Sequence, residues 1–334
     1  MIVSYSPGEF NEDFPHIPAF SQTLNYSMGL FEGMSAIIGE KGISLFHPDL
    51  NYERLQWGVD FFKLPYKVPV EKSIYTVFKL IKLNNYHTLP KGTRIYVRPL
   101  IYVRNTYVGL TPPKEGEIAL LHAISPMGKY LPVPEEGIKV WIAPLPRTLP
   151  FAKVKASSNY QLSLYARRLL PEGFHEAAFL NAQGKLVEGS GENVVVVKDN
   201  TLYTPKEDSL PGITLRLVLM LAEEMGLSWE FKSFTLEEIK QADALFFTGN
   251  AAGIVPIGLI EKDGTTYQAK NDFSLVKELQ KEYDKLFWGQ PEQYHVFMEE
   301  FLGENDSFQV PERWEKIKEE NISKLGMHSK YSSI

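Results

Sequence analysis

The sequence predicts a mixed α/β (α+β) fold that is divided between two domains. Its 334 residues exceed the length at which a single hydrophobic core usually stops growing. Segments with helical periodicity alternate along the chain with segments of period two, a mixture that is typical of sheets covered by helices. Residues 126–137 contain three prolines and two glycines, which favours an interdomain linker. We therefore expect a small α+β domain over 1–125, a large domain over 138–305 and a C-terminal extension over 306–334.

Turn and stop signals locate the elements before the linker. Residues 34–46 alternate between apolar and other side chains around Gly39-Glu40-Lys41-Gly42, which predicts a hairpin. Residues 49–64 carry apolar side chains at helical spacing and are followed by Pro65, so they predict a helix that ends there. The other elements expected in this part are a helix over 71–83 and strands over 94–104 and 118–125.

The same kinds of signal continue after the linker. Turn-forming residues at 181–184 and at 199–200 separate short apolar runs, and each predicts a pair of strands. An amphipathic helix is expected over 214–225, where Gly226 would end it. Residues 235–238 form a capping box that opens a short helix. The other elements expected here are strands over 138–143, 244–248 and 253–260 and helices over 159–170 and 273–288.

The composition excludes several classes of function. Thirty-five basic and forty-one acidic residues give a net charge of −6 without any basic cluster, so nucleic acid is not an expected partner. The absence of cysteine excludes disulfides, thiolate metal sites and a cysteine nucleophile. Seven histidines lack the spacing of metal ligands, so no metal is expected. No apolar run reaches membrane-spanning length and the first residues do not resemble a signal peptide, so we expect a cytoplasmic protein without a membrane partner.

Three segments indicate chemistry through their order and spacing. Lys155 lies in Ala-Lys-Val-Lys-Ala-Ser-Ser-Asn-Tyr, and Glu188 opens Glu-Gly-Ser-Gly-Glu-Asn 33 positions later. Leu-Pro-Gly-Ile-Thr then opens a helix at Thr214. A lysine that can form an imine, a carboxylate that can face a protonated pyridine nitrogen and a helix start that can bind phosphate are the parts required to hold pyridoxal phosphate. We therefore expect this cofactor.

Each of these parts also has an ordinary structural explanation. Most lysines are solvated surface charges, and Lys153 is expected to be one, but the small residues after Lys155 leave room for a bulky group. The segment after Glu188 is a turn in which two glycines would take positive φ. Helix starts such as the one at Thr214 are common, and the loop 249–253 between two strands is by itself only a turn.

Two arginines have unusual sequence neighbours. Arg98 lies in a predicted strand two positions after Tyr96, so both side chains project from one face. A buried arginine requires an anion, and from sequence a protein carboxylate and a substrate carboxylate are equally good partners for Arg98. Arg54 falls in the middle of a predicted helix, where arginine is usually solvated or paired with a residue four positions away.

Together these motifs resemble the class IV (fold type IV) aminotransferases, most closely the branched-chain amino acid aminotransferases. The resemblance runs from about residue 25 to 288 and includes Tyr-Val-Arg-Pro-Leu at 96–100 and the segment 25–33. It implies a two-domain fold like that of D-amino acid aminotransferase, bound pyridoxal 5'-phosphate, a homodimer, and amino acids and 2-oxoacids as substrates. The reaction would be ping-pong transamination between a branched-chain L-amino acid (Leu, Ile or Val) and 2-oxoglutarate.

The resemblance also implies roles for individual residues. Lys155 would be the Schiff-base lysine and would carry the proton between the substrate Cα and the cofactor. The other cofactor contacts would be Tyr160 at the phenolic oxygen, Glu188 at the pyridine nitrogen, and Arg54, Ile213, Thr214 and Asn250 at the phosphate. The substrate contacts would be Tyr96 and the N–H of Ala251 at the α-carboxylate, Tyr26, Arg98 and Tyr130 at the distal carboxylate of glutamate, and Phe31 in the apolar pocket.

Several positions depart from the family pattern, and they leave the substrate open. Ser35 stands where a basic residue is usual, Met127 where some bacterial members have tryptophan, Asn250 where threonine is usual, and Gly253 where an acidic residue is frequent. The alternatives are a D-amino acid or (R)-amine aminotransferase, a lyase of the aminodeoxychorismate type, and a paralogue that binds without turnover. The tail beyond Val310 extends past the usual family end, and its last six residues are expected to fray.

Overall fold

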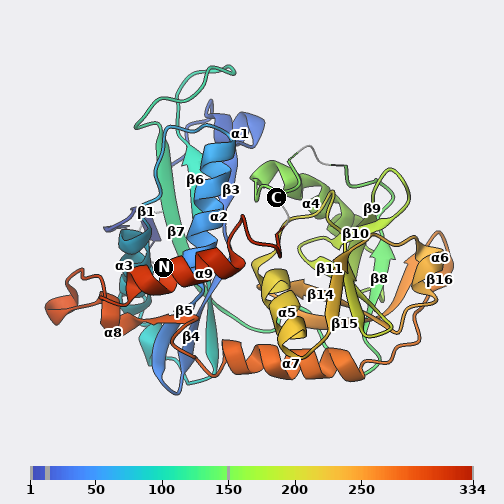
Figure 1. Cartoon of the computed structure of the whole chain (residues 1–334). Coiled ribbons are helices and arrows are strands. Elements are labelled where there is room, and N and C mark those ends of the chain that lie inside the picture. Colours follow the sequence, from blue (N-terminus) through green and yellow to red (C-terminus); the bar gives the residue numbers. More distant parts are fainter. Residues whose placement is uncertain (1–2, 12–15, 149–150, 333–334) are drawn as a thin grey trace. The chain divides into compact units, whose positions relative to one another are not determined.

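The computed structural model describes residues 3–11, 16–148 and 151–332, and these residues form two compact units (Figure 1). The first unit contains the chain up to Gly128 together with Val154–Ser158 and Lys285–Ser329. The second contains Lys129–Lys153, Asn159–Asp284 and the chain from Lys330. Each unit is therefore built from several separate segments of the sequence. The five-residue segment that contains Lys155 belongs to the first unit.

The first unit contains an eight-stranded sheet in the order β17-β5-β4-β6-β7-β1-β2, with β3 paired to β6. All of its strand pairs are antiparallel. The predicted hairpin is confirmed as β4 and β5, and Gly42, at φ 116°, begins β5 directly after the turn. The strands are β1 (Val3–Ser6), β2 (Glu9–Asn11), β3 (Gly29–Phe31), β4 (Met34–Gly39), β5 (Gly42–Phe46), β6 (Thr93–Val103), β7 (Ile118–Met127) and β17 (His295–Phe297).

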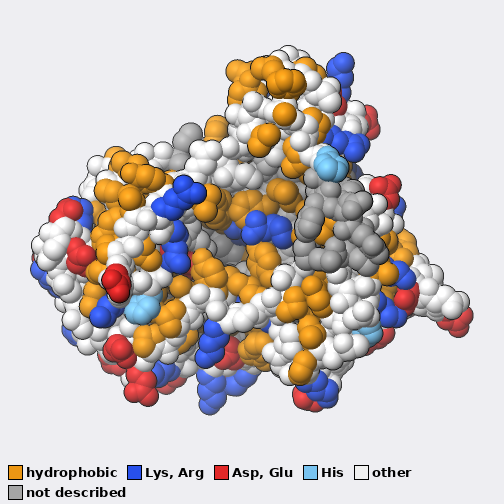
Figure 2. Space-filling model, turned by 180° about the vertical axis from the view of Figure 1, so that it is seen from behind, with side chains coloured by type: hydrophobic (Ala, Val, Ile, Leu, Met, Phe, Trp, Pro, Cys, Tyr) orange, Lys and Arg blue, Asp and Glu red, His pale blue; other side chains and the backbone are white. Residues whose placement is uncertain are grey.

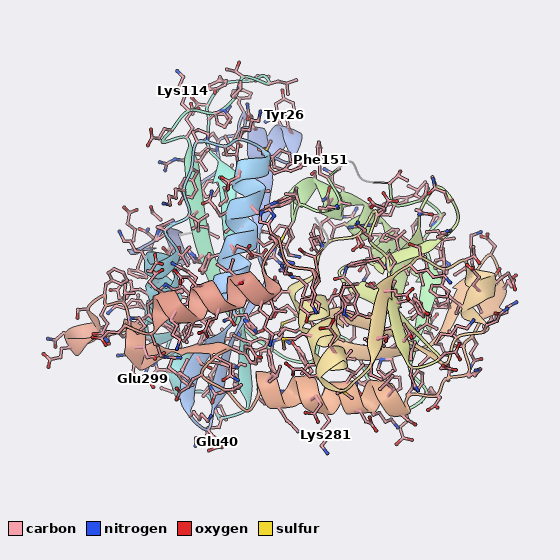
Figure 3. All side chains as sticks on the ribbon, viewed as in Figure 1. Tyr26, Glu40, Lys114, Phe151, Lys281 and Glu299 are labelled. Atoms are coloured by element: carbon pink, nitrogen blue, oxygen red, sulfur yellow. The ribbon has the colours of Figure 1, made fainter. Side chains whose placement is uncertain are left out.

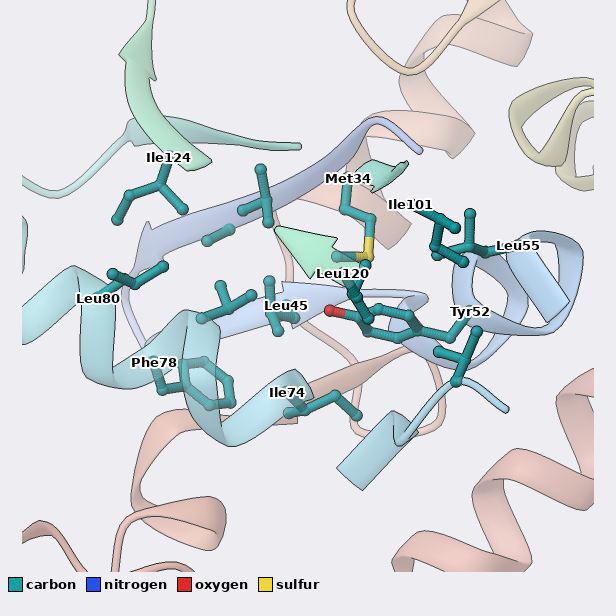
Figure 4. Close-up of a cluster of buried hydrophobic side chains, with 14 of the residues drawn as sticks. Met34, Leu45, Tyr52, Leu55, Ile74, Phe78, Leu80, Ile101, Leu120 and Ile124 are labelled. Carbon is teal, nitrogen blue, oxygen red and sulfur yellow. The ribbon is translucent and has the colours of Figure 1, made fainter. Parts of the chain in front are cut away.

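Two helices of the first unit pack against the sheet through apolar faces. Figure 4 shows Tyr52 and Leu55 of α2 and Phe78 of α3 among side chains from β4 to β7, and all of these are almost completely buried. Burial of such side chains stabilises the unit by about 1.5–3 kcal/mol each. The helices are α1 (Gln22–Tyr26), α2 (Pro48–Phe61), α3 (Val70–Leu83), α8 (Met298–Phe301) and α9 (Trp314–Leu325), with 3-10 turns η1 (Tyr86–Thr88) and η3 (Glu304–Asp306).

The second unit contains a nine-stranded mixed sheet in the order β10-β9-β8-β15-β14-β11-β12-β13, with β16 paired to β15. Strand β10 also pairs with β11, so the strands from β10 to β11 close into a ring. Closure satisfies strand edges that would otherwise be exposed. The strands are β8 (Ile138–Ile142), β9 (Glu176–Leu180), β10 (Leu186–Gly189), β11 (Asn193–Lys198), β12 (Thr201–Thr204), β13 (Ser228–Phe231), β14 (Ala244–Gly249), β15 (Gly253–Lys262) and β16 (Thr265–Tyr267).

Helix α5 (Ile213–Glu224) is the most deeply buried helix of the second unit, because every residue from Ile213 to Ala222 is buried. A helix that is apolar around its circumference must be covered on several sides. The predicted capping box of Thr235 is confirmed at the start of α6 (Leu236–Ile239). The other helices are η2 (Ser157–Asn159), which begins in the first unit, α4 (Tyr160–Leu169), and α7 (Ser274–Phe287), which ends there.

The tail differs from its expected structure. Helix α9 forms in the C-terminal extension, where no helix or strand was expected, and Asn321 on it donates a 2.6 Å hydrogen bond to the carboxylate of Asp49 on α2. The expectation that the chain frays from Ser329 is wrong through Ser332, because Tyr331 is only 4% exposed. Residues 333–334 lie outside the described part. Within the described ranges, no helix has the length and apolarity required to cross a membrane.

Candidate active site

The segment that carries Lys155 is fixed against strand β3 of the first unit. The N–H of Phe31 donates to the carbonyl of Lys155 at 3.1 Å, and Ala156 forms a bridge with Leu30. A Cβ at Gly29 would lie 2.8 Å from Oγ of Ser157, so a larger residue here would require the Ser157 hydroxyl to move. Lys155 is half-buried, and its ammonium lies 5.0 Å from the centre of the Phe31 ring. This environment differs from that of a solvated surface lysine.

Arg98 and Tyr96 project together from β6, as the strand period predicts. The guanidinium of Arg98 donates to the Tyr96 hydroxyl at 3.0 Å from Nε and at 2.5 Å from Nη2. The guanidinium carbon Cζ of Arg98 lies 4.2 Å from the centre of the Phe31 ring. No residue in the described ranges places a carboxylate within ion-pairing distance of Arg98. The protein carboxylate that sequence left open as its partner is therefore not found in this part of the chain.

The guanidinium of Arg98 and the ammonium of Lys155 therefore both lie within about 5 Å of the centre of the Phe31 ring. The Tyr96 hydroxyl is held close to the backbone of Gly33, where an added Cβ would lie 2.7 Å from it. Apolar surface, positive charge and a hydroxyl are thus adjacent in one unit. This combination can accept an aliphatic group or a carboxylate.

Arg54 departs from the usual environment of an arginine in a helix, because it is neither solvated nor paired four residues away. Arg54 is 6% exposed, and it forms a bidentate pair with Glu32, which is fully buried. The Nε–Oε1 and Nη2–Oε2 distances are 2.7 and 2.8 Å. The partner lies 22 residues earlier, so no helical spacing could reveal it. The pair fixes the orientation of the guanidinium.

In the second unit, the carboxylate of Glu188 is linked to the loop that begins α5. Glu188 is 4% exposed; it forms an ion pair with Arg147 and accepts the N–H of Leu210 at 3.2 Å. Asn193, at the other end of the turn, donates its side-chain amide to the carbonyl of Leu210 at 2.7 Å. A Cβ at Gly212 would lie 2.0 Å from Oδ1 of Asn193, so this position requires glycine. Two of the three predicted motifs therefore meet within one unit.

The glycines after Glu188 have a different role from the expected one. Neither Gly189 nor Gly191 takes a positive φ, so that expectation is wrong. A Cβ at Gly189 would instead lie 2.7 Å from Oε2 of Glu192 and 3.1 Å from the ring of Phe247. Crowding rather than backbone conformation therefore requires glycine at position 189.

The start of α5 presents backbone N–H groups without a side-chain cap. Its N-cap is Gly212, which makes no side-chain hydrogen bond, and Ile213 and Thr214 follow with 8% and 6% exposure. The first N–H groups of a helix lack intrahelical acceptors and favour an anion. Between β14 and β15, Asn250 and Ala251 are half-buried at the loop tip. Thr248 is fully buried beside them, and its hydroxyl has no hydrogen-bond partner among the described residues.

A buried carboxylic acid lies next to the turn of Glu188. Glu192 is 4% exposed, and its carboxyl accepts the N–H of Gly191 at 3.0 Å. Burial, and then the carboxylate of Glu176, raise the pKa of Glu192 well above its usual range. Glu176 in turn accepts the hydroxyl of Ser190 at 2.7 Å and pairs with Arg167 at 3.1 Å. The protonated form of Glu192 therefore adds no further buried negative charge beside Glu188.

The remaining predicted residues lie nearer the surface of each unit. Tyr26 ends α1 and is 43% exposed (Figure 3). Tyr130 is also 43% exposed, and Tyr160 is half-buried as the first residue of α4. Sequence reasoning did not find the partners Glu32 and Arg147. Both act across long sequence separations, and no local pattern marks them.

Comparison with known proteins decides the family. Residues 29–260 match the family model described as amino-transferase class IV. The chain belongs to the class IV aminotransferase family. It is therefore an aminotransferase, and its cofactor is pyridoxal 5'-phosphate. The buried Glu188, the uncapped start of α5 and the unpartnered hydroxyl of Thr248 fit a cofactor with a basic ring nitrogen and a phosphate.

Relatives and solved structures agree with this membership. The branched-chain-amino-acid aminotransferase of Escherichia coli K12 is 31% identical over 288 residues, which cover 83% of this chain and 89% of the relative. The corresponding protein of Pseudomonas aeruginosa is 29% identical, with 81% and 88% covered. The crystal structure of the Thermoproteus uzoniensis branched-chain aminotransferase with norvaline superposes with a TM-score of 0.78 at 29% identity, and 89% of this chain and 99% of that chain are covered. The Escherichia coli structure gives a TM-score of 0.77 at 27% identity, with the same coverage. The predicted two-domain type IV fold is confirmed.

Proposed function

We propose that this aminotransferase transfers the amino group of a branched-chain L-amino acid to 2-oxoglutarate in two successive half-reactions. The relatives with about 30% identity over most of the chain are named for branched-chain amino acids. The observation that carries the proposal is the arrangement around Phe31, whose ring lies against the guanidinium of Arg98. An aliphatic side chain can contact the ring in one half-reaction, and the distal carboxylate of glutamate can pair with Arg98 in the other.

Each residue proposed to contact the cofactor would have its own role. When bound, pyridoxal phosphate withdraws electrons from the substrate Cα. Lys155 would hold the cofactor covalently in the resting enzyme, and its amine, released when the substrate binds, would carry the proton from the substrate Cα to the cofactor. Glu188 would accept a hydrogen bond from the ring nitrogen, and Arg147 compensates the charge of this buried carboxylate. The residues proposed for the phosphate are Arg54, Ile213, Thr214 and Asn250, and Tyr160 is proposed for the phenolic oxygen.

The substrate would be bound through its α-carboxylate and, in the case of glutamate, also through its distal carboxylate. Tyr96 and the N–H of Ala251 would receive the α-carboxylate, which both half-reactions share. Tyr26, Arg98 and Tyr130 would receive the distal carboxylate of glutamate. Since Tyr96 also accepts hydrogen bonds from Arg98, the two carboxylate sites would be coupled through this hydroxyl.

Product analysis separates this function from its alternatives. The holoenzyme is incubated with 2-oxoglutarate and one amino donor at a time: L-leucine, L-isoleucine, L-valine, D-alanine or an (R)-amine. Glutamate formed with the three L-amino acids, and not with D-alanine or the amine, supports the proposal. Glutamate formed only with D-alanine or the amine would contradict it and favour the alternative within the family. Pyruvate released from aminodeoxychorismate without any 2-oxoacid would favour a lyase instead.

We also propose a homodimer, and an exposed apolar surface of the first unit supports it. Helix α1 and the loop after β6 are joined, because the Gln22 side chain donates to the carbonyls of Gly109 and Thr111 at 3.2 and 2.5 Å. Leu24 and Leu110 on these two segments are 64% and 80% exposed. Figure 2 shows hydrophobic side chains gathered on the upper part of the molecule, where these segments lie. Exposed apolar surface of this kind favours association between protein copies.

The mass in solution tests the dimer. Light scattering on the holoenzyme should give twice the mass of one chain, and the double variant Leu24→Glu, Leu110→Glu should give the mass of a monomer. A monomeric wild-type protein would contradict the proposal. The cytoplasmic location expected from the sequence stays a prediction.

A further inference from the structure

The last described residues of the chain are held against helix α5 and strand β13 of the second unit. Lys330 places Nζ 3.0 and 2.8 Å from the two carboxylate oxygens of Glu223, near the C-terminal end of α5. Tyr331 donates its hydroxyl to the same carboxylate at 2.7 Å, and Trp229 of β13 donates its indole N–H at 2.8 Å. The rings of Trp229 and Tyr331 have centres 5.7 Å apart. Glu223 therefore receives three donors, two of them from the tail.

The tail also reaches the opposite end of the same helix. Ser332 is 7% exposed and lines a small pocket with Leu210, Pro211 and Leu215. Leu210 and Pro211 belong to the loop that begins α5, and Leu215 lies in its first turn. The segment from Lys330 to Ser332 thus binds α5 near its C-terminal end and lines a pocket beside its first turn.

The charges around Glu223 favour this attachment at neutral pH. The hydrogen bond from Lys330 lowers the pKa of the Glu223 carboxyl, and those from Tyr331 and Trp229 act in the same direction. Burial, and then the Glu223 carboxylate, raise the pKa of Tyr331 to about 12. Around neutral pH the carboxylate is therefore an acceptor and the tyrosine hydroxyl a donor, so the hydrogen bond is charge-assisted.

The position of α5 matters for the cofactor because its first turn carries Ile213 and Thr214. A helix behaves as a rigid rod, so a displacement at Glu223 moves the N–H groups at the other end. Hydrogen bonds to a phosphate weaken steeply with distance and angle. Strand β13 and the segment from Lys330 both contact α5.

We propose that the C-terminal segment from Lys330 is a positioning element for the phosphate of the cofactor. It holds α5 so that the first-turn N–H groups and the Thr214 hydroxyl meet the phosphate together. This inference rests on the proposed placement of the phosphate at Ile213 and Thr214. A merely structural role, in which the tail covers the edge strand β13, would affect stability without distinguishing between ligands.

The test compares pyridoxal phosphate with pyridoxal, which lacks the phosphate group. The affinity of the full-length apoprotein for each compound is measured by titration for wild type, Tyr331→Phe, Glu223→Gln and a chain that ends at Ser329. We expect the truncation to weaken pyridoxal phosphate about tenfold, which corresponds to the loss of one hydrogen bond to a charged group. Affinity for pyridoxal should stay within about twofold, because no phosphate is involved. Lys316→Ala, in an exposed pair with Glu320 on α9, is the matched control and should change neither affinity.

A second readout does not depend on the cofactor. Hydrogen exchange of the apoprotein should be faster at the amides of 213–216 in the truncated chain than in wild type. If the truncated chain does not fold, Tyr331→Phe and Glu223→Gln decide the question, since both keep the packing of the tail. Their pyridoxal phosphate affinities should fall by a few-fold, and the double variant should fall less than the product of the two.

Each other outcome overturns a specific claim. Equal weakening for both compounds, or no weakening in any tail variant, would overturn the positioning role. The underlying function is checked separately with Thr214→Ala. If that variant loses the preference for the phosphorylated compound while the tail variants keep it, only the tail inference fails. If wild type shows no such preference, the placement of the phosphate at α5 fails as well.

Discussion

Replacing Arg147 with methionine should destabilise the second unit by about 3–5 kcal/mol, because it leaves a carboxylate buried without its cation. Both partners of the Arg147–Glu188 pair have side chains that are only 5% exposed. Methionine fills a similar length with apolar atoms, so the packing against Phe179, whose ring centre lies 5.3 Å from the guanidinium, is largely retained. The loss therefore reports the uncompensated charge rather than a cavity.

The double variant Arg147→Met, Glu188→Gln separates stability from function. Removing both charges should recover most of the lost stability, because a neutral amide is far less costly to bury than a carboxylate. It should not recover transamination, because an amide cannot balance a protonated pyridine nitrogen as a carboxylate does. The second substitution would then restore stability without restoring activity.

Urea unfolding followed by fluorescence and circular dichroism provides the measurement, with the apoprotein used throughout. The matched control is Lys240→Met, which removes the exposed pair with Glu237 and should cost less than about 1 kcal/mol. If Arg147→Met lost no more stability than this control, the buried pair would not compensate charge as we reason. If the double variant regained full activity, Glu188 would not act at the ring nitrogen.

Three further outcomes can be checked with single variants. Lys155→Ala should abolish transamination while the circular dichroism spectrum stays unchanged, and an activity loss below about tenfold would remove Lys155 from its proposed role. Arg98→Ala should slow the glutamate half-reaction about tenfold or more relative to the leucine half-reaction, as measured by stopped-flow; equal losses would mean that Arg98 only supports Tyr96. Burial lowers the pKa of His122 to about 3, so the unfolded chain takes up this proton first as pH falls below about 6.5. Stability should therefore be lost towards pH 3, by at most about 1.4 kcal/mol per pH unit for this group, and denaturant titrations of His122→Gln should show a shallower fall than wild type; parallel curves would contradict the assignment.

Local signals predicted most of the elements, and physical chemistry explains which ones. The hairpin around Gly39 to Gly42, the helix before Pro65 and the capping box at Thr235 depend on residues within a few positions of each other. Their patterns are therefore visible in a single sequence. The short strands β1, β2 and β17 and the helix α9 depend on distant partners, such as Asp49 for α9, and no local pattern reveals them.

The candidate site shows the same division. The motif that contains Glu188 and the one that contains Thr214 were expected to act together, and the link from Glu188 to Leu210 joins their segments within one unit. The pairing of Tyr96 with Arg98 followed directly from the strand period. The pair between Arg54 and Glu32 could not be predicted, because a buried arginine takes whichever carboxylate the tertiary fold supplies.

The glycines and the tail illustrate two further limits. A glycine in a sequence does not say whether it serves a positive φ or a close approach, and Gly189 serves the second. A chain end without a clear pattern was expected to fray. Tyr331 is instead buried, because its hydroxyl donates to Glu223 and its ring packs near that of Trp229. Both partners lie about a hundred residues earlier in the sequence.

The most direct test of the central claim follows the visible absorption of the bound cofactor through one complete cycle. The purified protein is saturated with pyridoxal phosphate and freed of excess, and L-leucine is added without any 2-oxoacid. We predict that the visible band disappears and that it returns when the amino acid is removed and 2-oxoglutarate is added. A band that never forms, or that L-leucine, L-isoleucine and L-valine all leave unchanged, would contradict the proposed transamination.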